Sequence, residues 1–464
     1  MFKLFKMILI NIILFNSSLV VASEFLAISD IHFNPYEICE DKKEKKCTEL
    51  LKELINSKPE IWDTVFEKYY DLKKFPLYGK NTNYSLFKSL LQEVKRQIEK
   101  NNYKFVVVLG DFLAHFYVQN YEIYSGDHSK KGAEKFISLT LKYLSFELKK
   151  AVGNKIEIFP VIGNNDSYID NYNVDNPKGS NFYKDLLSSW GELNKGIKES
   201  DSFLAGGYYL ANTSINKLSI IALNTNIFSL NAKSSDNTNI KNLTTNQLNW
   251  FEKSFNKNGN NNFLVISHIP CAIDPFTSIR QWEKEKKVAT FWSEKYVNIN
   301  KNYLNTLTHN SNNISGILVG HTHHDGFQLL NQDLGLYSVS VPGVSLAHFN
   351  NPAFKVFKLD EANNLSNAIT YYFDVKEKSW KQGSDFNQNF ESKNLFIGMQ
   401  SLVGKWLKDL DEPDEKFLKY FFVNSPFANK ISAKWKYYAC AMSDNLETSD
   451  YEDCLNENRD NKEN

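Results

Sequence analysis

The sequence predicts an α/β fold, because short, continuously apolar segments alternate with segments of helical periodicity. Continuous apolar runs are typical of strands that are covered on both faces. The expected strands occupy residues 25–29, 105–109, 156–162, 218–223, 263–266 and 314–319. The expected helices between them occupy residues 85–100, 133–150 and 245–255, and Ser85 is the expected cap of the first helix.

After Gly335 the pattern changes from alternation to successive strands, which we expect at residues 336–341, 354–359 and 368–375. From about Asp385 the sequence becomes helical, with segments around 396–410, 415–422 and 433–442. We therefore expect a main domain over residues 24–384 and a small C-terminal helical subdomain over residues 385–464.

Length and composition indicate an ordinary folded globule. The chain has 464 residues, of which 42% are hydrophobic and 23% charged. The 54 basic and 54 acidic residues give a net charge of zero, so no basic excess is available to bind a nucleic-acid backbone. We expect a monomer without a nucleic-acid partner.

Residues 1–23 have the pattern of a secretory signal peptide. Lys3 and Lys6 precede an apolar run at 7–15, and Val21, Ala22 and Ser23 offer a small-residue cleavage site. The alternative is a membrane anchor, but the apolar run is short for a spanning helix, and no later stretch is long and apolar enough. The sequence thus predicts a secreted, periplasmic or lumenal protein with no transmembrane segment after cleavage.

Five cysteines fit an exported chain, in which disulfides can form. Cys39 with Cys47 and Cys440 with Cys454 are the closest pairs in sequence and are the favoured bridges, although spacing alone does not establish connectivity. Cys271 is then left over, and we expect it to be a small buried residue.

Five clusters of potential metal ligands each follow a predicted strand, and they contain five of the nine histidines. They are Asp30-Ile31-His32, Gly110-Asp111 with His115 nearby, Gly163-Asn164-Asn165-Asp166, Ser267-His268, and Gly320-His321-Thr322-His323. Each motif alone is common in proteins and is usually structural. Ligands in α/β sheets sit at the carboxyl ends of strands, so five such clusters in order predict a shared site. Carboxylate, imidazole and amide ligands suit a two-metal hydrolytic centre.

The series of clusters resembles the calcineurin-like metallophosphoesterase superfamily. Less specific motifs are similar to those of the acid sphingomyelinase-like phosphodiesterases, and the resemblance covers nearly all of the mature chain. These motifs are the segments at 110–115, 267–270, 350–354 and 420–423, and the C-terminal residues Cys440 and 451–454. The resemblance implies a four-layer αββα sandwich as the catalytic domain at residues 24–384.

The resemblance also implies a role for seven ligands. It places Asp30, His32 and His323 on a first metal ion and Asn164, His268 and His321 on a second, with Asp111 bridging the two. Two ions held about 3.5–4 Å apart can share a hydroxide that attacks phosphorus. Zinc is expected by analogy with related enzymes, although the mixed nitrogen and oxygen ligands also suit iron and manganese.

One position departs from the pattern of the superfamily. A histidine that assists the leaving group usually follows the third-cluster Asn, but here the residue is Asn165. An amide can donate a hydrogen bond but cannot deliver a proton. His115 is the nearest substitute for that histidine. The alternative is that His115 only orients Asp111. We expect substrates with good leaving groups, such as aryl phosphates or phosphoanhydrides.

Together these patterns predict an exported, dinuclear-metal, sphingomyelinase-like phosphodiesterase that acts on a small-molecule or lipid substrate and cleaves phosphodiester or phosphoanhydride bonds. One alternative is a phosphomonoesterase or polyphosphate hydrolase. An alternative of another class is a catalytically inactive, metal-binding interaction protein, against which the seven intact ligand positions argue.

Overall fold

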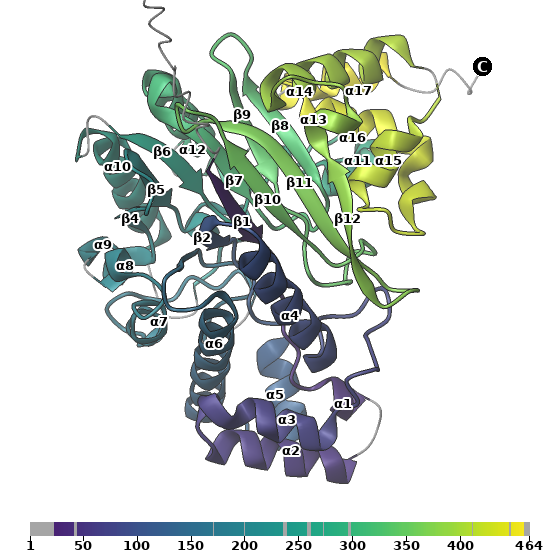
Figure 1. Cartoon of the computed structure of the whole chain (residues 1–464). Coiled ribbons are helices and arrows are strands. Elements are labelled where there is room, and N and C mark those ends of the chain that lie inside the picture. Colours follow the sequence, from purple (N-terminus) through teal and green to yellow (C-terminus); the bar gives the residue numbers. More distant parts are fainter. Residues whose placement is uncertain are drawn as a thin grey trace, which may run out of the picture.

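Two six-stranded sheets form the centre of the protein (Figure 1). The first contains, in spatial order, β12 (Ser379–Asp385), β11 (Leu365–Asp374), β10 (Ala353–Leu359), β1 (Glu24–Ile28), β2 (Tyr103–Val108) and β3 (Glu157–Pro160). The second contains β4 (Tyr209–Asn212), β5 (Leu218–Ala222), β6 (Asn262–Ile266), β7 (Ile314–Val319), β9 (Leu336–Ser340) and β8 (Gly326–Asn331). Strands β1–β3 run parallel, as do β5, β6, β7 and β9, while the remaining pairs are antiparallel.

The computed structural model describes the chain from Ser23 onward, so the predicted signal peptide at residues 1–23 lies outside the described residues except for Ser23. The described ranges are 23–40, 44–169, 171–198, 200–234, 239–257, 261–271, 273–295, 298–410, 412–444 and 447–458. None of the helices in these ranges combines the length and apolar character needed to cross a membrane.

Helices surround the sheets in three groups. Before β3 lie α1 (Glu37–Glu40), α2 (Glu44–Asn56), α3 (Trp62–Tyr69), α4 (Tyr84–Lys100), α5 (Tyr117–Ser125) and α6 (Lys130–Val152). Between β3 and β7 lie α7 (Phe182–Trp190), α8 (Lys195–Lys198), α9 (Asp201–Gly206), α10 (Ile240–Lys257), α11 (Pro275–Glu285) and α12 (Ile299–His309). After β12 come α13 (Phe386–Asn389), α14 (Leu395–Gly404), α15 (Glu415–Phe421), α16 (Trp435–Met442) and α17 (Thr448–Glu457).

Alternate residues of the central strands pack into different cores, which separates the layers. Leu264 and Ile266 of β6 belong to the large core shared with the first sheet. Phe263 and Val265 point the other way, into a second core with side chains of α10 and α12. A strand covered on both faces is continuously apolar, which is why the sequence pattern identified it. The α/β fold with two packed sheets is confirmed.

The cap of α4 differs from the expectation. The helix begins at Tyr84, and the Asn83 side chain accepts a hydrogen bond from the Leu86 amide at 3.0 Å. Ser85 lies inside the helix and donates instead to the Asp71 carbonyl at 3.0 Å. Asn caps a helix at least as well as Ser, so the nearby asparagine takes this role.

Both favoured disulfides, Cys39–Cys47 and Cys440–Cys454, are confirmed, and Cys271 is free and buried. The second bridge joins α16 to α17. Around it Ile273, Trp282 and Tyr451 form a small core that links the α11 segment to the C-terminal helices, drawn in yellow in Figure 1. Helix α16 also packs on β8 of the second sheet.

Candidate metal centre

The two sheets bring all seven predicted ligands to one place. Each ligand lies in a loop that follows the carboxyl end of a strand, so strand order determines which ligands meet. The first sheet supplies Asp30 and His32 after β1, Asp111 after β2 and Asn164 after β3. The second supplies His268 after β6, and His321 and His323 after β7.

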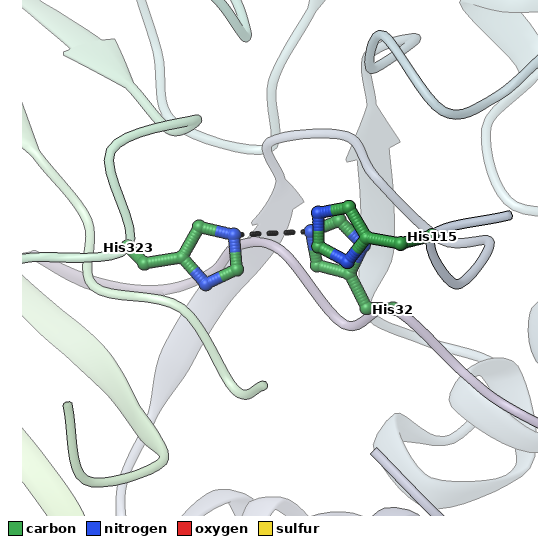
Figure 2. Close-up of side chains that lie close together, drawn as sticks. All are labelled: His32, His115 and His323. Carbon is green, nitrogen blue, oxygen red and sulfur yellow. Dashed lines mark hydrogen bonds between the residues drawn. The ribbon is translucent and has the colours of Figure 1, made fainter. Parts of the chain in front are cut away.

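One group of ligand atoms consists of Asp30, His32 and His323. The Nε2 atoms of the two histidines are 3.1 Å apart, and Figure 2 shows the two rings facing each other across the site. The Oδ1 atom of Asp30 lies 3.4 Å from His323 Nε2 and 3.7 Å from His32 Nε2. This oxygen is buried and has no hydrogen-bond partner, so a cation would satisfy it.

A second group consists of Asn164, His268 and His321. The Asn164 Oδ1 atom lies 2.9 Å from His268 Nε2 and 2.8 Å from His321 Nδ1. The His268 Nδ1 atom faces the Leu109 carbonyl at 2.6 Å and must donate to it. A neutral His268 would therefore direct a lone pair at the Asn164 oxygen, an arrangement that needs a proton or a cation between the two atoms.

Asp111 lies between the two groups. Its Oδ2 atom is 3.3 Å from His32 Nε2 and 3.4 Å from His268 Nε2. Burial opposes protonation of His268, yet the charge and hydrogen bond of Asp111 outweigh burial and raise the pKa of His268 to about 9. The acceptor oxygens around His268 Nε2 therefore favour a positive charge at this position.

Five of the seven ligand residues have a left-handed backbone conformation, which non-glycine residues rarely adopt. Their φ angles are 49° at Asp30, 45° at His32, 52° at Asp111, 70° at His321 and 61° at His323. Such residues cost roughly 1–3 kcal/mol each and occur mainly where the surrounding structure fixes a functional site.

Asp166 holds the second and third loops together. Its Oδ1 atom accepts from the amides of Phe112 and Leu113 at 2.9 and 3.1 Å, and its Oδ2 atom accepts from the Gly163 amide at 2.9 Å. Burial and the nearby charge of Asp111 raise the pKa of Asp166 to about 7. Asp166 therefore links the loop that follows Asp111 to the loop that holds Asn164.

Asn165 contacts Asp111. Its backbone amide donates to Oδ1, and its side-chain amide donates to Oδ2, both at 2.8 Å. Asn165 does not line the cavity beside the ligands, whereas His115 does. These contacts fix the orientation of the Asp111 carboxylate.

The His115 ring stacks on the His32 ring at 4.2 Å and lies close to it in Figure 2. Its Nδ1 atom pairs with the Asn81 side-chain oxygen at 2.7 Å. Since that oxygen only accepts, Nδ1 carries the proton and Nε2 is left as an acceptor in the neutral ring. Burial and the charge of His32 lower the pKa of His115 to about 3. No hydrogen bond joins it to Asp111 in the described part of the chain.

A cavity of about 340 Å³ opens beside the ligands, and several of its wall residues were not predicted as site residues. The Tyr172 hydroxyl lies 3.4 Å from His321 Nε2, and Asn171 accepts a hydrogen bond from Asn164 at 2.7 Å. The His348 ring lies 4.2 Å from the His323 ring and also lines the cavity. Nothing in the sequence spacing identifies Tyr172 or Asn171.

Replacing Gly110 with Ala should disrupt the centre. Gly110 has φ +84°, and an added Cβ would lie 2.7 Å from the Gly163 nitrogen and 2.9 Å from His268 Nδ1. Gly153 provides a matched control, because it has φ +83° with nothing within 4 Å of a Cβ. We expect Gly153→Ala to cost about 1 kcal/mol of unfolding free energy through backbone strain alone. Gly110→Ala should cost about 1–3 kcal/mol more, measured by urea denaturation, and weaken metal binding. Equal losses would contradict the close packing.

Three comparisons place the chain among known proteins. The family profile described as calcineurin-like phosphoesterase matches residues 23–325. Sphingomyelinase phosphodiesterase D from Dictyostelium discoideum is 25% identical over 329 residues, which cover 69% of this chain and 66% of that protein. Acid sphingomyelinase-like phosphodiesterase 3b from Homo sapiens is 25% identical over 175 residues, which cover 34% of this chain and 35% of that protein.

Among solved structures, a calcineurin-like phosphoesterase from Bacillus subtilis aligns with a TM-score of 0.30 and 13% identity, over 82% of this chain and 96% of that one. The matched segments span less than two thirds of the length of either curated relative. The family match, in contrast, covers more than half of this chain and every one of the seven ligand positions. The chain therefore belongs to the calcineurin-like phosphoesterase family.

Proposed function

We propose that this protein is a phosphodiesterase that works with two divalent metal ions. Asp30, His32 and His323 would hold the first ion, and Asn164, His268 and His321 the second, with Asp111 shared between them. The observation that carries the proposal is the position of Asp111 Oδ2, within 3.4 Å of a histidine nitrogen from each group. When bound, such a pair of ions activates water and neutralises charge on a phosphate in the transition state.

The side chains of the chain itself would keep this centre in shape. The Leu113 and Leu109 carbonyls accept from Nδ1 of His32 and His268, which directs both Nε2 atoms into the site. Ser29 and the His321 amide donate to Asp30 Oδ2, which leaves Oδ1 as the free ligand atom. These contacts preorganise the centre, so substrate binding requires little rearrangement.

Neither of the two residues expected to assist the leaving group, Asn165 and His115, offers it a proton. Asn165 contributes only amide hydrogen bonds to Asp111, and neutral His115 presents an acceptor rather than a donor at Nε2. We therefore retain the expectation that good leaving groups are favoured.

Replacing Asn165 with His should reduce the dependence of kcat/KM on leaving-group pKa. A positioned acid helps most when the leaving group is poor, so alkyl esters should gain about tenfold or more relative to aryl esters. Rates for a series of phosphodiesters of graded leaving-group pKa measure the effect. Asn165→Ala is the control, because it removes the side-chain contact with Asp111 without adding an acid. Equal slopes for wild type and Asn165→His would refute the role assigned to this position.

The substrate is proposed from the relatives: both are named as phosphodiesterases of the sphingomyelinase type, which favours a small-molecule or lipid phosphodiester. Zinc is the proposed metal, and iron and manganese suit the same ligands. The two disulfides support export to an oxidising compartment.

Metal analysis of the purified protein, together with hydrolysis of bis-p-nitrophenyl phosphate in added Zn²⁺ or Mn²⁺, tests the proposal. We expect about two metal ions per chain and metal-dependent release of p-nitrophenol. A protein that binds no metal and hydrolyses no ester would instead be an interaction protein.

A further inference from the structure

The cavity extends well beyond the metal ligands. One end is formed by ligand residues such as Asp111 and His321. The other end lies between the start of α11, the end of α16 and the strands β8 and β9, with Phe276, Gln328 and Met442 in its wall. We call this second end the distal arm. Asp325 helps to fix it, because its amide donates to the Phe421 carbonyl of α15 at 3.0 Å.

The walls of the distal arm carry no positive side chain. Among the described residues that line the whole cavity there is neither a lysine nor an arginine. Lys355 contacts the lining residue Asp325, but its ammonium is buried in this ion pair, at 2.7 Å. Arg280 is exposed and lies 5.6 Å from the Phe276 ring, outside the lining.

The remaining charge of the arm is negative. The Asp274 carboxylate lines the arm and caps α11, since it accepts from the amide of Thr277 at 3.0 Å and from the hydroxyl of Thr277 at 2.5 Å. These bonds use two of its lone pairs and leave its charge uncompensated by a basic residue in the lining. An anion in the arm would meet this carboxylate with no cationic side chain in the lining, because Arg280, which also acts on Asp274, lies outside the lining. Such a contact is costly in a partly buried site.

The rest of the wall suits an uncharged group. Phe276 and Phe327 supply apolar surface. The buried Gln328 and Ser338 supply neutral hydrogen-bonding groups at the closed side. A volume of about 340 Å³ for the whole cavity lies within the range of small-molecule sites.

We propose that the distal arm binds the part of the substrate beyond the reacting phosphate, and that it accepts an uncharged, partly apolar group but rejects one that carries a second phosphate. The inference rests on the proposed function, because the metal ligands must hold the reacting phosphate. Of the two kinds of substrate with good leaving groups expected above, which the metal ligands alone do not distinguish, the arm selects one. Aryl esters whose leaving group carries no second phosphate are hydrolysed, and phosphoanhydrides such as nucleoside triphosphates and polyphosphate are not.

Two unreactive ligands test the charge preference of the arm. Phenylphosphonate and 1,4-phenylenediphosphonate share one ring and differ by a second phosphonate at its far end. We expect the Zn²⁺-loaded protein to bind phenylphosphonate about tenfold tighter or more, measured by isothermal titration calorimetry. Without the arm, the second anion should strengthen attraction to the two metal ions, so equal or tighter binding of the diphosphonate overturns the proposal.

Matched lysine variants locate the effect. Phe276 is 52% exposed and lines the arm, whereas Ile397 is 56% exposed on α14 and does not line the cavity. Phe276→Lys should narrow the difference between the two ligands by about tenfold, and Ile397→Lys should leave it unchanged. Asp274→Asn should also narrow the difference, because Asn keeps the helix cap and removes the charge. A difference that neither cavity variant alters would overturn the assignment to the arm.

Hydrolysis of bis-p-nitrophenyl phosphate separates this inference from the proposed function. A protein that hydrolyses this ester but binds both phosphonates equally has the proposed activity without the charge selection. A protein that binds no metal, hydrolyses no ester and binds neither phosphonate overturns both.

Discussion

Replacing Asp111 with Asn should reduce kcat/KM by roughly a thousandfold or more, because the shared ligand loses its charge and half of its acceptor capacity. The amide is close in shape to the carboxylate, so the fold should persist. In the wild type the Asp111 Oδ2 atom faces one histidine nitrogen from each of the two groups of proposed ligands. An amide NH₂ in that position would repel both ions. Rates with bis-p-nitrophenyl phosphate and metal content per chain measure the two losses.

Thermal unfolding adds a readout that does not depend on catalysis. Ions that bind only the folded protein raise Tm, so added Zn²⁺ should stabilise the wild type and stabilise Asp111→Asn far less. Asp360→Asn is the control, since Asp360 is exposed, accepts from the amides of Ala362 and Asn364 and does not line the cavity. If Asp111→Asn keeps the full metal content and the full rise in Tm, Asp111 is not a shared ligand.

Replacing Lys355 with Met should lower the free energy of unfolding by about 3–5 kcal/mol. Lys355 and Asp325 are each 1% exposed, and the ammonium lies within 2.7–2.8 Å of both carboxylate oxygens. Burial lowers the pKa of Lys355, and Asp325 opposes this effect by favouring the charged form. Removing the lysine would leave a buried carboxylate with hydroxyl donors, such as that of Thr370, but no cation to balance its charge.

The same strand provides a matched control for this variant. Lys358 of β10 pairs with Glu24 at 3.4 Å, but its side chain is 37% exposed. Lys358→Met should therefore cost less than about 1 kcal/mol in urea denaturation. The double variant Lys355→Met with Asp325→Asn should recover part of the lost stability, because no buried charge is left unpaired. Similar losses for the two lysine variants would show that burial does not strengthen the first pair.

The sequence predicted the central strands well because their burial on two faces leaves a continuous apolar signal. Strands β4, β8 and β12 were not predicted; β12 in particular has few buried residues and includes Gly383, so its apolar signal is weak. The seven predicted ligands meet at one place because each follows a strand whose carboxyl end points to the same region. This logic requires only strand order, and it does not depend on helix boundaries.

Contacts between loops could not be predicted in the same way. Asn81 pairs with His115, and Tyr172 approaches His321, across 34 and 149 residues of sequence. Neither contact has a periodic signal in the sequence, since Asn81 and Tyr172 lie in irregular loops whose paths depend on tertiary packing. The distal arm combines α11, α16 and two strands for the same reason, and only the folded chain shows that these segments meet.

The Cys440–Cys454 bridge gives the arm a dependence on its chemical surroundings. Cys440 belongs to the helix whose last turn, at Ala441 and Met442, faces the cavity. All seven proposed ligands precede this helix by more than a hundred residues and make no covalent link to it. Reduction of the bridge would therefore loosen the α16 wall of the distal arm and leave the loops that carry the proposed metal ligands in place. A thiol-rich milieu would leave the protein loaded with metal but less discriminating in what it accepts.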